Sequence, residues 1–430
     1  MLKTILENIS LSVLYKIIAF IADWFPHTDK FFDKVVLKLL GESRLAREFI
    51  NRNVNKLKRT SRRTNVCVIA DVNIGDAINI QSIIFALHVF LPEANIDYVI
   101  NKKALSLIEG FPGIQTVYGV YTAVPLTTAD VDTINKLLEN NKYDIVFNFC
   151  PFYSKKIILP PDTIEINWWG IVPLIVKDMA KPFIKAHMTL QLYKYIQLLF
   201  TNSEATPQGA FPGTKVVISS GAITQAESFI QSNGLSNLKK ILLNPDTSSP
   251  FTRIPFHLQV SLLERLTELP CKILLAPGYN KKGIEHSLIK ALPHHKQNKC
   301  TIIPIPLELD VYAALIDHCD VFITGDTGPL HIAAAQKISR TGDFVFKNHT
   351  AIFSIFGATP PRLYAYDSLR PGFVSSSQNA MSYAYEGNCY RNILYIINRN
   401  ILPFDGDYYF NDIDLDKIVM DIRFCMAEGN

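Results

Sequence analysis

The pattern of apolar and polar positions from residue 65 onward alternates between two kinds of segment. Short runs rich in β-branched and aromatic residues, such as "NVCVIAD" and "IDYVIN", predict buried strands. Longer segments with apolar residues every three or four positions, such as 78–91 and 104–111, predict helices. Alternation of strand and helix is typical of an α/β fold with a parallel, doubly wound sheet.

The alternation occurs twice. Further strands of the first cycle are predicted at 114–120 and 143–149, whereas 151–235 is less regular and carries Trp168 and Trp169. The second cycle has strands at 239–246, 271–278, 300–305, 320–326 and, as the last one, 350–357, with helices at 258–269, 284–292, 309–319 and 329–336. Two Rossmann-like domains, 65–235 and 236–400, are therefore predicted, with an N-terminal extension at 1–64 and a C-terminal helix within 401–430.

The extension adds a membrane hypothesis. Its first 23 residues place five apolar side chains on one helical face. Charged residues interrupt the segment, so its apolar runs are too short to span a membrane. Residues 51–63 carry six Lys and Arg and no acid. An amphipathic helix followed by a basic stretch suits peripheral contact with an anionic membrane, and a helical cap on the first domain is the alternative.

Composition narrows the class of protein further. The 430 residues carry a net charge of +4, which is small for this length and gives no indication of a nucleic-acid partner. Seven scattered cysteines without a Cys-x-x-Cys pair indicate reduced thiols in a cytoplasmic protein and no zinc site. No metal ligand set is predicted.

Two loops at predicted strand ends carry candidate chemistry. In "VFITGDTGPLH", Asp326 follows a buried strand, Gly328 frees the backbone, and a helix containing His331 begins. The free N–H groups of such a turn can bind a diphosphate, while Asp326 can accept hydrogen bonds from sugar hydroxyls. The alternative is a capped helix with His331 as a buried, hydrogen-bonded imidazole.

The other loop, "DVNIGDAIN", contains Gly75 and Asp76 but lacks Gly-x-Gly-x-x-Gly, so a dinucleotide fingerprint is not supported. Gly75 permits close backbone approach to a ligand. Asp76 is either a functional carboxylate or simply the N-cap of the following helix.

The motif Asp326-Thr327-Gly328-x-x-His331-x-Ala-Ala-Ala resembles the signature of glycosyltransferase family 9, the lipopolysaccharide heptosyltransferases. The stretches "IGDAINIQSIIFALHVFLPEANIDYVI" and "ILLNPDTSSPFTRIP" are similar to two further family segments, and the resemblance covers roughly residues 65–361. It implies a GT-B fold and an inverting, metal-independent transfer from a nucleotide sugar, with an ADP-linked sugar such as ADP-heptose favoured and no bound cofactor.

The resemblance also implies roles for individual residues. Asp76 matches the catalytic base of the family's Gly-Asp pair, and Asp326, Thr327, Gly328 and His331 match the donor-binding turn. Asn244 and Thr247 match the loop beside the diphosphate, and Leu307 matches an apolar contact to the nucleobase. The implied acceptor is a lipid-linked, cell-envelope glycan at the inner face of the cytoplasmic membrane.

Some positions depart from the family pattern. Thr252 stands where the family has a phosphate-binding lysine, and the adjacent Arg253 is a candidate to supply the charge. Gln81 stands at a common proline, and Asn79 at an occasional histidine. A non-catalytic nucleotide-sugar-binding homologue and a nucleotide-sugar epimerase on the same fold therefore stay open as alternatives.

Overall fold

The computed structural model describes residues 65–70, 73–122, 126–149, 157–167, 171, 187–201, 213–278, 280–304, 307–346, 350–366, 380–384, 407–411 and 413–428. The predicted amphipathic helix, the basic stretch and the two tryptophans lie outside these residues. The chain divides into two compact units, which are described separately. Unit 1 is residues 1–217 with 340–342, and unit 2 is residues 218–339 with 343–430.

Unit 1 contains a five-stranded parallel sheet with the order β3-β2-β1-β4-β5. The strands are β1 (Asn65–Ile69), β2 (Asn95–Asn101), β3 (Thr116–Tyr121), β4 (Ile145–Asn148) and β5 (Ile164–Asn167). In the central strand, Val66 to Ile69 are completely buried, as expected for a parallel strand covered by helices on both faces.

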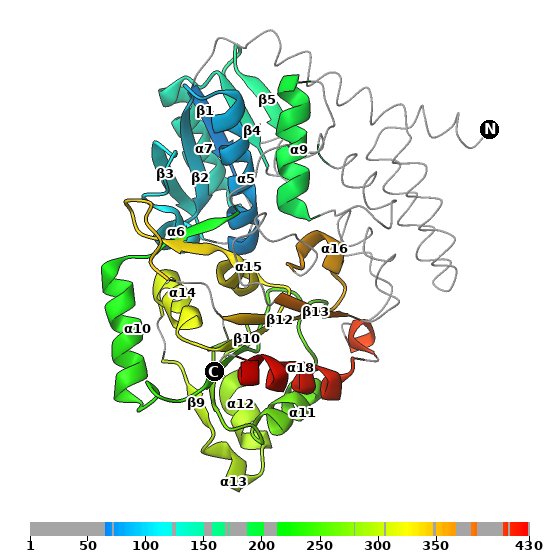
Figure 1. Ribbon diagram of the computed structural model, residues 1–430. Coiled ribbons are helices and arrows are strands. Elements are labelled where there is room, and N and C mark those ends of the chain that lie inside the picture. The colour runs from blue at the N-terminus through cyan, green and yellow to red at the C-terminus, as the bar shows by residue number, and fades with distance from the viewer. Residues whose placement is uncertain are drawn as a thin grey trace, which may run out of the picture. The chain divides into compact units, whose positions relative to one another are not determined.

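Helices cover both faces of this sheet. They are α5 (Ile74–Phe90), η1 (Lys102–Ala104), α6 (Leu105–Ile108), α7 (Thr128–Asn141) and α9 (Met188–Thr201), and a short strand, β6 (Lys215–Val217), follows. Helix α7 begins with a capping box between Thr127 and Asp130 and buries its apolar face against β1, β3 and β4. Helix α5 packs against α9, and Figure 1 shows the two side by side.

Unit 2 contains a six-stranded parallel sheet with the order β13-β12-β10-β7-β8-β9. The strands are β7 (Lys240–Asn244), β8 (Lys272–Leu275), β9 (Cys300–Ile302), β10 (Val321–Gly325), β12 (Ala351–Phe356) and β13 (Ala380–Ala384). The prediction that the strand around residues 350–357 is the last one is wrong, because β13 extends the sheet beyond it.

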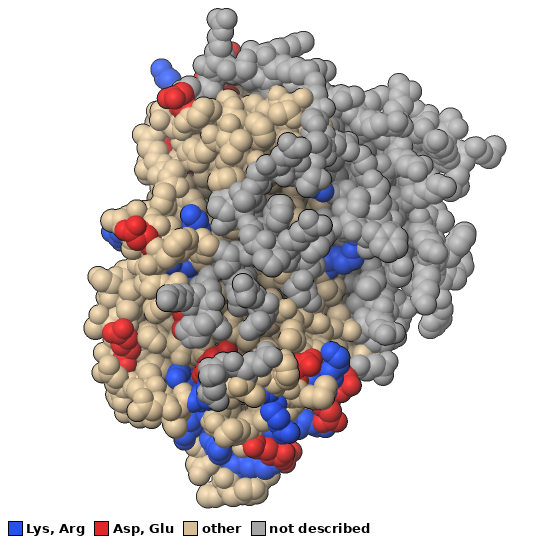
Figure 2. All heavy atoms as spheres, in the orientation of Figure 1, with Lys and Arg blue, Asp and Glu red and all other residues tan. Residues whose placement is uncertain are grey.

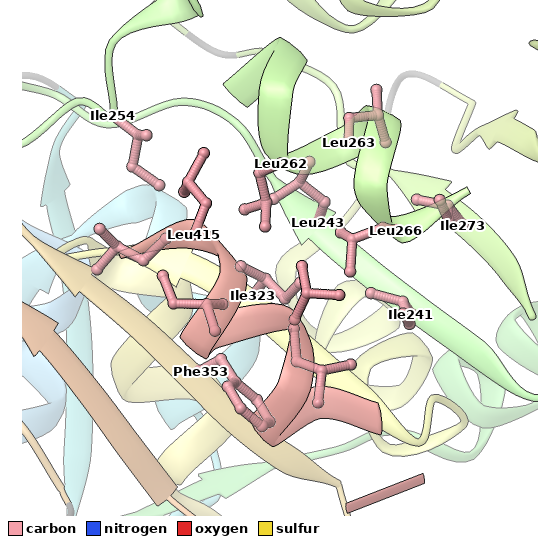
Figure 3. Packing of buried hydrophobic residues seen from close by; sticks show 14 of the residues in the cluster. Ile241, Leu243, Ile254, Leu262, Leu263, Leu266, Ile273, Ile323, Phe353 and Leu415 are labelled. Atoms are coloured by element: carbon pink, nitrogen blue, oxygen red, sulfur yellow. The ribbon is translucent and has the colours of Figure 1, made fainter. Parts of the chain in front are cut away.

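The main core of unit 2 lies between this sheet and the helices on one face. Ile241, Leu243 and Ile323 point from the strands toward α11 (Phe256–Leu266) and α18 (Leu415–Glu428), as Figure 3 shows. The alternate strand residue Phe322 packs on the other face against Tyr312 of α14 (Leu309–Asp317). The remaining elements are α10 (Ser220–Ser232), α12 (Ile284–Ala291), α13 (His294–Gln297), α15 (Gly328–Ala334), β11 (Gln336–Ile338), α16 (Pro361–Tyr364) and η4 (Asp407–Phe410).

The predicted α/β class with parallel sheets is confirmed, and α18 lies within the predicted segment 401–430. Helix α5 begins four residues before the predicted start, because Gly75 is accommodated in its first turn. The irregular region predicted at 151–235 contains β5, α9, β6 and α10. Gln336, predicted in a helix, begins β11 instead.

The surface charges and the cysteine thiols of the described residues do not point to a further functional site. On the face drawn in Figure 2, Lys and Arg of the described residues are interspersed with Asp and Glu. The five cysteines that the structure describes are free thiols, and burial raises the pKa of Cys271 and of Cys300 to about 11. Within the described part of the chain, no helix combines the length and apolar character needed to cross a membrane.

Candidate active site

The order of strands in unit 2 marks where a ligand is expected. The chain runs outward from β7 to β8 and β9, then returns to β10 on the other side of β7 and continues outward. Ligands of doubly wound sheets bind at this switch point, beyond the carboxyl ends of the two neighbouring strands. Asn244 ends β7, and its Nδ2 donates hydrogen bonds to Thr324 Oγ1 in β10 and to the Asp246 carbonyl, both at 3.0 Å.

Asp246 organises the loop that follows β7. Its side chain is 3% exposed, and Oδ1 accepts a hydrogen bond from Arg253 Nε at 2.9 Å. Oδ2 accepts the backbone N–H groups of Asn280 at 2.6 Å and Lys281 at 2.9 Å. The carboxylate therefore fastens the loop after β7 to the loop after β8, at the carboxyl edge of the sheet. Motif matching did not single out Asp246, although an acid at a buried strand end with an arginine seven residues later was a usable signal.

Thr252 and Arg253 are both engaged within this loop. The hydroxyl oxygens of Thr247 and Thr252 lie 2.9 Å apart, and they lie 2.8 and 3.3 Å, respectively, from the Ser249 carbonyl oxygen. Arg253 Nη2 donates to the Thr247 carbonyl at 2.9 Å, in addition to the ion pair with Asp246. The Asp246–Arg253 pair carries no net charge, so Arg253 adds little positive potential to the loop while this pair persists.

Gly325 joins the loop to the end of β10. A Cβ atom at this position would lie 2.8 Å from the Thr252 carbonyl oxygen and 3.2 Å from Thr247 Cγ2. Because backbone cannot yield as a flexible side chain can, only glycine permits this close approach. The structure thus brings four predicted residues, Asn244, Thr247, Thr252 and Arg253, into one network against the strand that leads to Asp326.

The turn after β10 contains the other predicted donor-side residues. Asp326, Thr327 and Gly328 are half-buried, and α15 begins at Gly328 with extended Thr327 as its N-cap. His331 is 4% exposed, and its Nδ1 lies 2.8 Å from the hydroxyl oxygen of Tyr366. Its Nε2 lies 3.9 Å from Asp326 Oδ1. Burial lowers the pKa of His331 to about 3, so the imidazole is neutral at physiological pH.

A buried ion pair fixes the other end of α15. Lys337 is completely buried, and its Nζ lies 2.8 Å from both Asp317 Oδ1 and the Ala333 carbonyl. The ammonium group thereby holds one of the last carbonyls of α15 and the end of α14 together. Leu307, half-buried, lies in the loop between β9 and α14, at the same carboxyl edge of the parallel sheet.

Unit 1 presents its own switch point between β1 and β4. Gly75 is buried and Asp76 half-buried in the first turn of α5, whose N-cap is Asn73. The alternative of Asp76 as the N-cap is therefore wrong, since the helix begins at Ile74. Nearby, the Tyr98 hydroxyl donates to the Ala77 carbonyl at 2.7 Å, and burial, together with the Asp76 charge, raises the pKa of Tyr98.

The next turn of α5 carries two unusual amides. Gln81 binds the backbone of Lys215 twice, donating to its carbonyl at 2.8 Å and accepting its N–H at 3.0 Å. Asn79 is completely buried, and among the described residues neither its Oδ1 nor its Nδ2 has a hydrogen-bond partner. The departure at Gln81 therefore has a structural role in fastening β6, whereas nothing in the fold of unit 1 explains an amide at Asn79.

No group of three or more His, Cys, Asp or Glu side chains in the described residues could hold a metal ion. Sequence reasoning missed Tyr366, which contacts His331 from 35 residues further along the chain. Only a tertiary structure reveals such a partner, because no local pattern connects it to the turn.

Comparisons with known proteins agree with this architecture. Residues 175–348 match the sequence model of glycosyltransferase family 9 (heptosyltransferase). No curated protein sequence is significantly similar to the chain.

Two solved structures are similar over most of their length. The Escherichia coli ADP-heptose lipopolysaccharide heptosyltransferase II aligns with a TM-score of 0.56 and 17% identity, covering 85% of this chain and 99% of that one. A family 9 glycosyltransferase from Veillonella parvula aligns with a TM-score of 0.58 and 17% identity, covering 85% and 97%. Identity this low supports the fold alone, and the predicted GT-B fold is confirmed. With the family match, the predicted resemblance is confirmed as well: the chain is a glycosyltransferase with a family 9 match over residues 175–348.

Proposed function

We propose that the chain is an inverting glycosyltransferase that uses an ADP-linked sugar, with ADP-heptose as the first candidate donor. The proposed acceptor is a lipopolysaccharide-type or other lipid-linked glycan of the cell envelope. The observation that carries the proposal is the placement of Asp326 to His331 directly after β10, at the switch point beside Asn244. The heptosyltransferase named in the comparison, whose fold this chain shares, acts with ADP-heptose.

The donor side of the proposed reaction belongs to unit 2. The backbone N–H groups of Thr327 and Gly328 stabilise the charge that builds on the leaving diphosphate, and Asn244 and Thr247 shape the neighbouring loop. Leu307 contacts the nucleobase. Thr252 and Arg253 support the loop, since their polar groups bond within it. Backbone groups therefore contribute more to diphosphate binding here than they would in a loop that has the family's lysine.

The acceptor side of the proposed reaction uses Asp76, beside buried Gly75. An acceptor hydroxyl attacks the anomeric carbon of the donor sugar from the face opposite the diphosphate. The bond from that carbon to the diphosphate oxygen breaks, and its electron pair leaves with ADP. The hydroxyl proton passes to the Asp76 carboxylate, which requires a base within hydrogen-bond reach of the acceptor. We place this reaction at the inner face of the cytoplasmic membrane, with residues 1–64 as the peripheral contact.

A transfer assay tests the proposal. Purified full-length protein is incubated with ADP-heptose and heptose-deficient lipopolysaccharide, with and without EDTA, and the acceptor mass is measured. A gain of one heptose that EDTA leaves unchanged is expected. ADP-heptose should also raise the melting temperature of the protein, because a ligand that binds only the folded state stabilises it.

The same assay separates the alternatives. Stabilisation without transfer to any envelope acceptor indicates a non-catalytic binding homologue. Conversion of the free nucleotide sugar to an isomer without acceptor indicates an epimerase. A melting temperature unchanged by ADP-heptose and by other ADP-sugars contradicts the proposed donor class.

A further inference from the structure

His331 lies in an aromatic and acidic setting that the proposed function does not yet use. The rings of Tyr364 and Tyr366 meet the imidazole edge-on, with centroids at 6.1 and 5.7 Å and interplanar angles of 72° and 68°. The Tyr366 hydroxyl lies 2.8 Å from Nδ1, and Asp326 Oδ1 lies 3.9 Å from Nε2. The two ring nitrogens therefore face different chemistry, a hydroxyl on one side and a carboxylate on the other.

Only one proton is shared between these nitrogens. Burial lowers the pKa of His331 to about 3, and a neutral imidazole carries an N–H at either Nδ1 or Nε2. If Nδ1 carried the proton, the Nε2 lone pair would face the acceptor-only carboxylate of Asp326, which is electrostatically unfavourable at this distance. If Nε2 carries it, the N–H dipole points its positive end toward that carboxylate.

The Tyr366 hydroxyl also affects which tautomer of His331 is favoured. A tyrosine hydroxyl can donate or accept, so it adapts to whichever tautomer the surroundings favour. Burial, together with the nearby Asp326 charge, raises the pKa of Tyr366, which keeps this hydroxyl protonated and able to donate. An O–H donor at Nδ1 and a carboxylate near Nε2 favour the same tautomer.

We propose that Tyr366 is a positioning residue that donates to Nδ1 of His331 and thereby holds this imidazole as the neutral Nε2–H tautomer. His331 then offers a donor, and Asp326 an acceptor, from two atoms 3.9 Å apart. This separation is too long for a direct hydrogen bond. Among the described residues, no hydrogen bond occupies Nε2 of His331.

A donor next to an acceptor selects a particular ligand group. A hydroxyl accepts from Nε2–H and donates to Asp326 at the same time. A phosphate oxygen only accepts, and Asp326 repels its charge. On the proposed function, the His331–Asp326 pair therefore binds a hydroxyl of the transferred sugar, while the diphosphate is left to the backbone of the turn.

The tautomer is measurable without any ligand. Nitrogen-15 NMR of the full-length protein with labelled histidine distinguishes protonated from unprotonated ring nitrogens, and His331→Gln identifies the His331 signals among the ten histidines. We expect a proton on Nε2 from pH 6 to 8. Tyr366→Phe should shift the His331 signals toward a mixture of tautomers, whereas Tyr364→Phe, which keeps its ring near His331, should not. A proton on Nδ1 in the wild-type protein would overturn the proposal, even if Tyr366→Phe failed to fold.

Calorimetry with two probes, ADP-heptose and ADP, tests the ligand group. Tyr366→Phe should weaken ADP-heptose binding about tenfold and ADP binding less than twofold, because ADP lacks the sugar hydroxyls. Equal weakening of both probes would overturn the hydroxyl assignment. If the wild-type protein bound ADP-heptose no more tightly than ADP, the proposed donor would be wrong and the hydroxyl assignment would fail with it, while the tautomer result would stand by itself.

Discussion

The two switch points of this protein differ in how completely their polar groups are bonded. In unit 2, the Asp246 carboxylate alone accepts three hydrogen bonds, and the hydroxyls of Thr247 and Thr252 are bonded within the loop. In unit 1, Asn79 has a buried amide one helical turn after Asp76, and no described residue bonds to it. Buried polar groups are nearly always bonded in folded proteins, so the difference is informative. The loop in unit 2 is fastened by hydrogen bonds of its own side chains, whereas the start of α5 carries a buried amide that no described residue bonds.

The largest expected effect concerns the acceptor side of this comparison. Asp76→Asn keeps the shape of the side chain but removes the base, so transfer should fall by about 10² to 10⁴-fold. ADP-heptose affinity, measured by calorimetry, should change little, because the donor groups lie in unit 2. Near-normal turnover would show that Asp76 is not the catalytic base. Of the two switch points, the turn in unit 2 alone would then keep its proposed role.

The next effect tests whether the unit 2 loop depends on its buried carboxylate. Asp246→Ala leaves Arg253 and two backbone N–H groups without their acceptor, and the free energy of unfolding should fall by about 3 kcal/mol in urea denaturation. Arg265 and Asp416 form a matched control pair, also with Nε and Oδ1 2.9 Å apart, but Asp416 is 84% exposed. Asp416→Ala should leave stability nearly unchanged. Equal losses from both substitutions would refute the rigid loop.

A third effect depends on pH. The pKa of His331 is about 3 in the folded protein and near 6.5 in an unfolded chain, so below pH 6.5 the unfolded state binds a proton that the folded state does not. The contribution of neutral His331 to the free energy of unfolding is therefore complete above pH 6.5. It declines by about 1.4 kcal/mol per pH unit as the pH falls toward 3. Between pH 7.5 and 5.0, His331→Gln should lose about 2 kcal/mol less than the wild type in urea denaturation. His294→Gln, an exposed site, should behave as the wild type, and parallel pH profiles for wild type and His331→Gln would show that His331 titrates normally.

The smallest effect concerns the orphaned amide itself. Asn79→Leu replaces it with an apolar side chain of similar size and should raise the free energy of unfolding by about 1 kcal/mol, since two unbonded polar atoms leave the core. Gln81→Leu, two residues along, should lower it, because the Lys215 backbone loses both partners. Destabilisation by Asn79→Leu would indicate that folding does require the amide, and the contrast between the two switch points would disappear.

The sequence predicted the frame of the fold better than its details. Buried apolar runs were sufficient for β1, β7 and β10, and apolar spacing was sufficient for α18. The start of α5 was missed because Gly75 resembles a loop residue in a local pattern, although a first turn tolerates it. β13 was missed because a strand at the edge of a sheet depends on its neighbour as much as on its own residues.

The candidate site divides in the same way. Asp326 and His331 were predicted from a local motif, since strand ends and turns have recognisable sequences, and Asn244 was predicted from the family resemblance. Asp246 and Tyr366 were missed because their roles depend on partners in other segments, Asn280 in one case and His331 in the other. Pairing across segments is a tertiary property, and no spacing along one segment encodes it.

The position of α18 in the core of unit 2 has a consequence for how the chain folds during translation. Ile418 of α18 and Ile241 of β7 lie in one apolar cluster, and the residue numbers 418 and 241 differ by 177. At roughly 5 to 20 residues per second, a ribosome synthesises β7 on the order of 10 to 30 seconds before it synthesises α18. During that interval the part of the apolar sheet face that α18 covers stays open to other chains. Production of the protein should therefore benefit more from added chaperones than from changes at the finished surface.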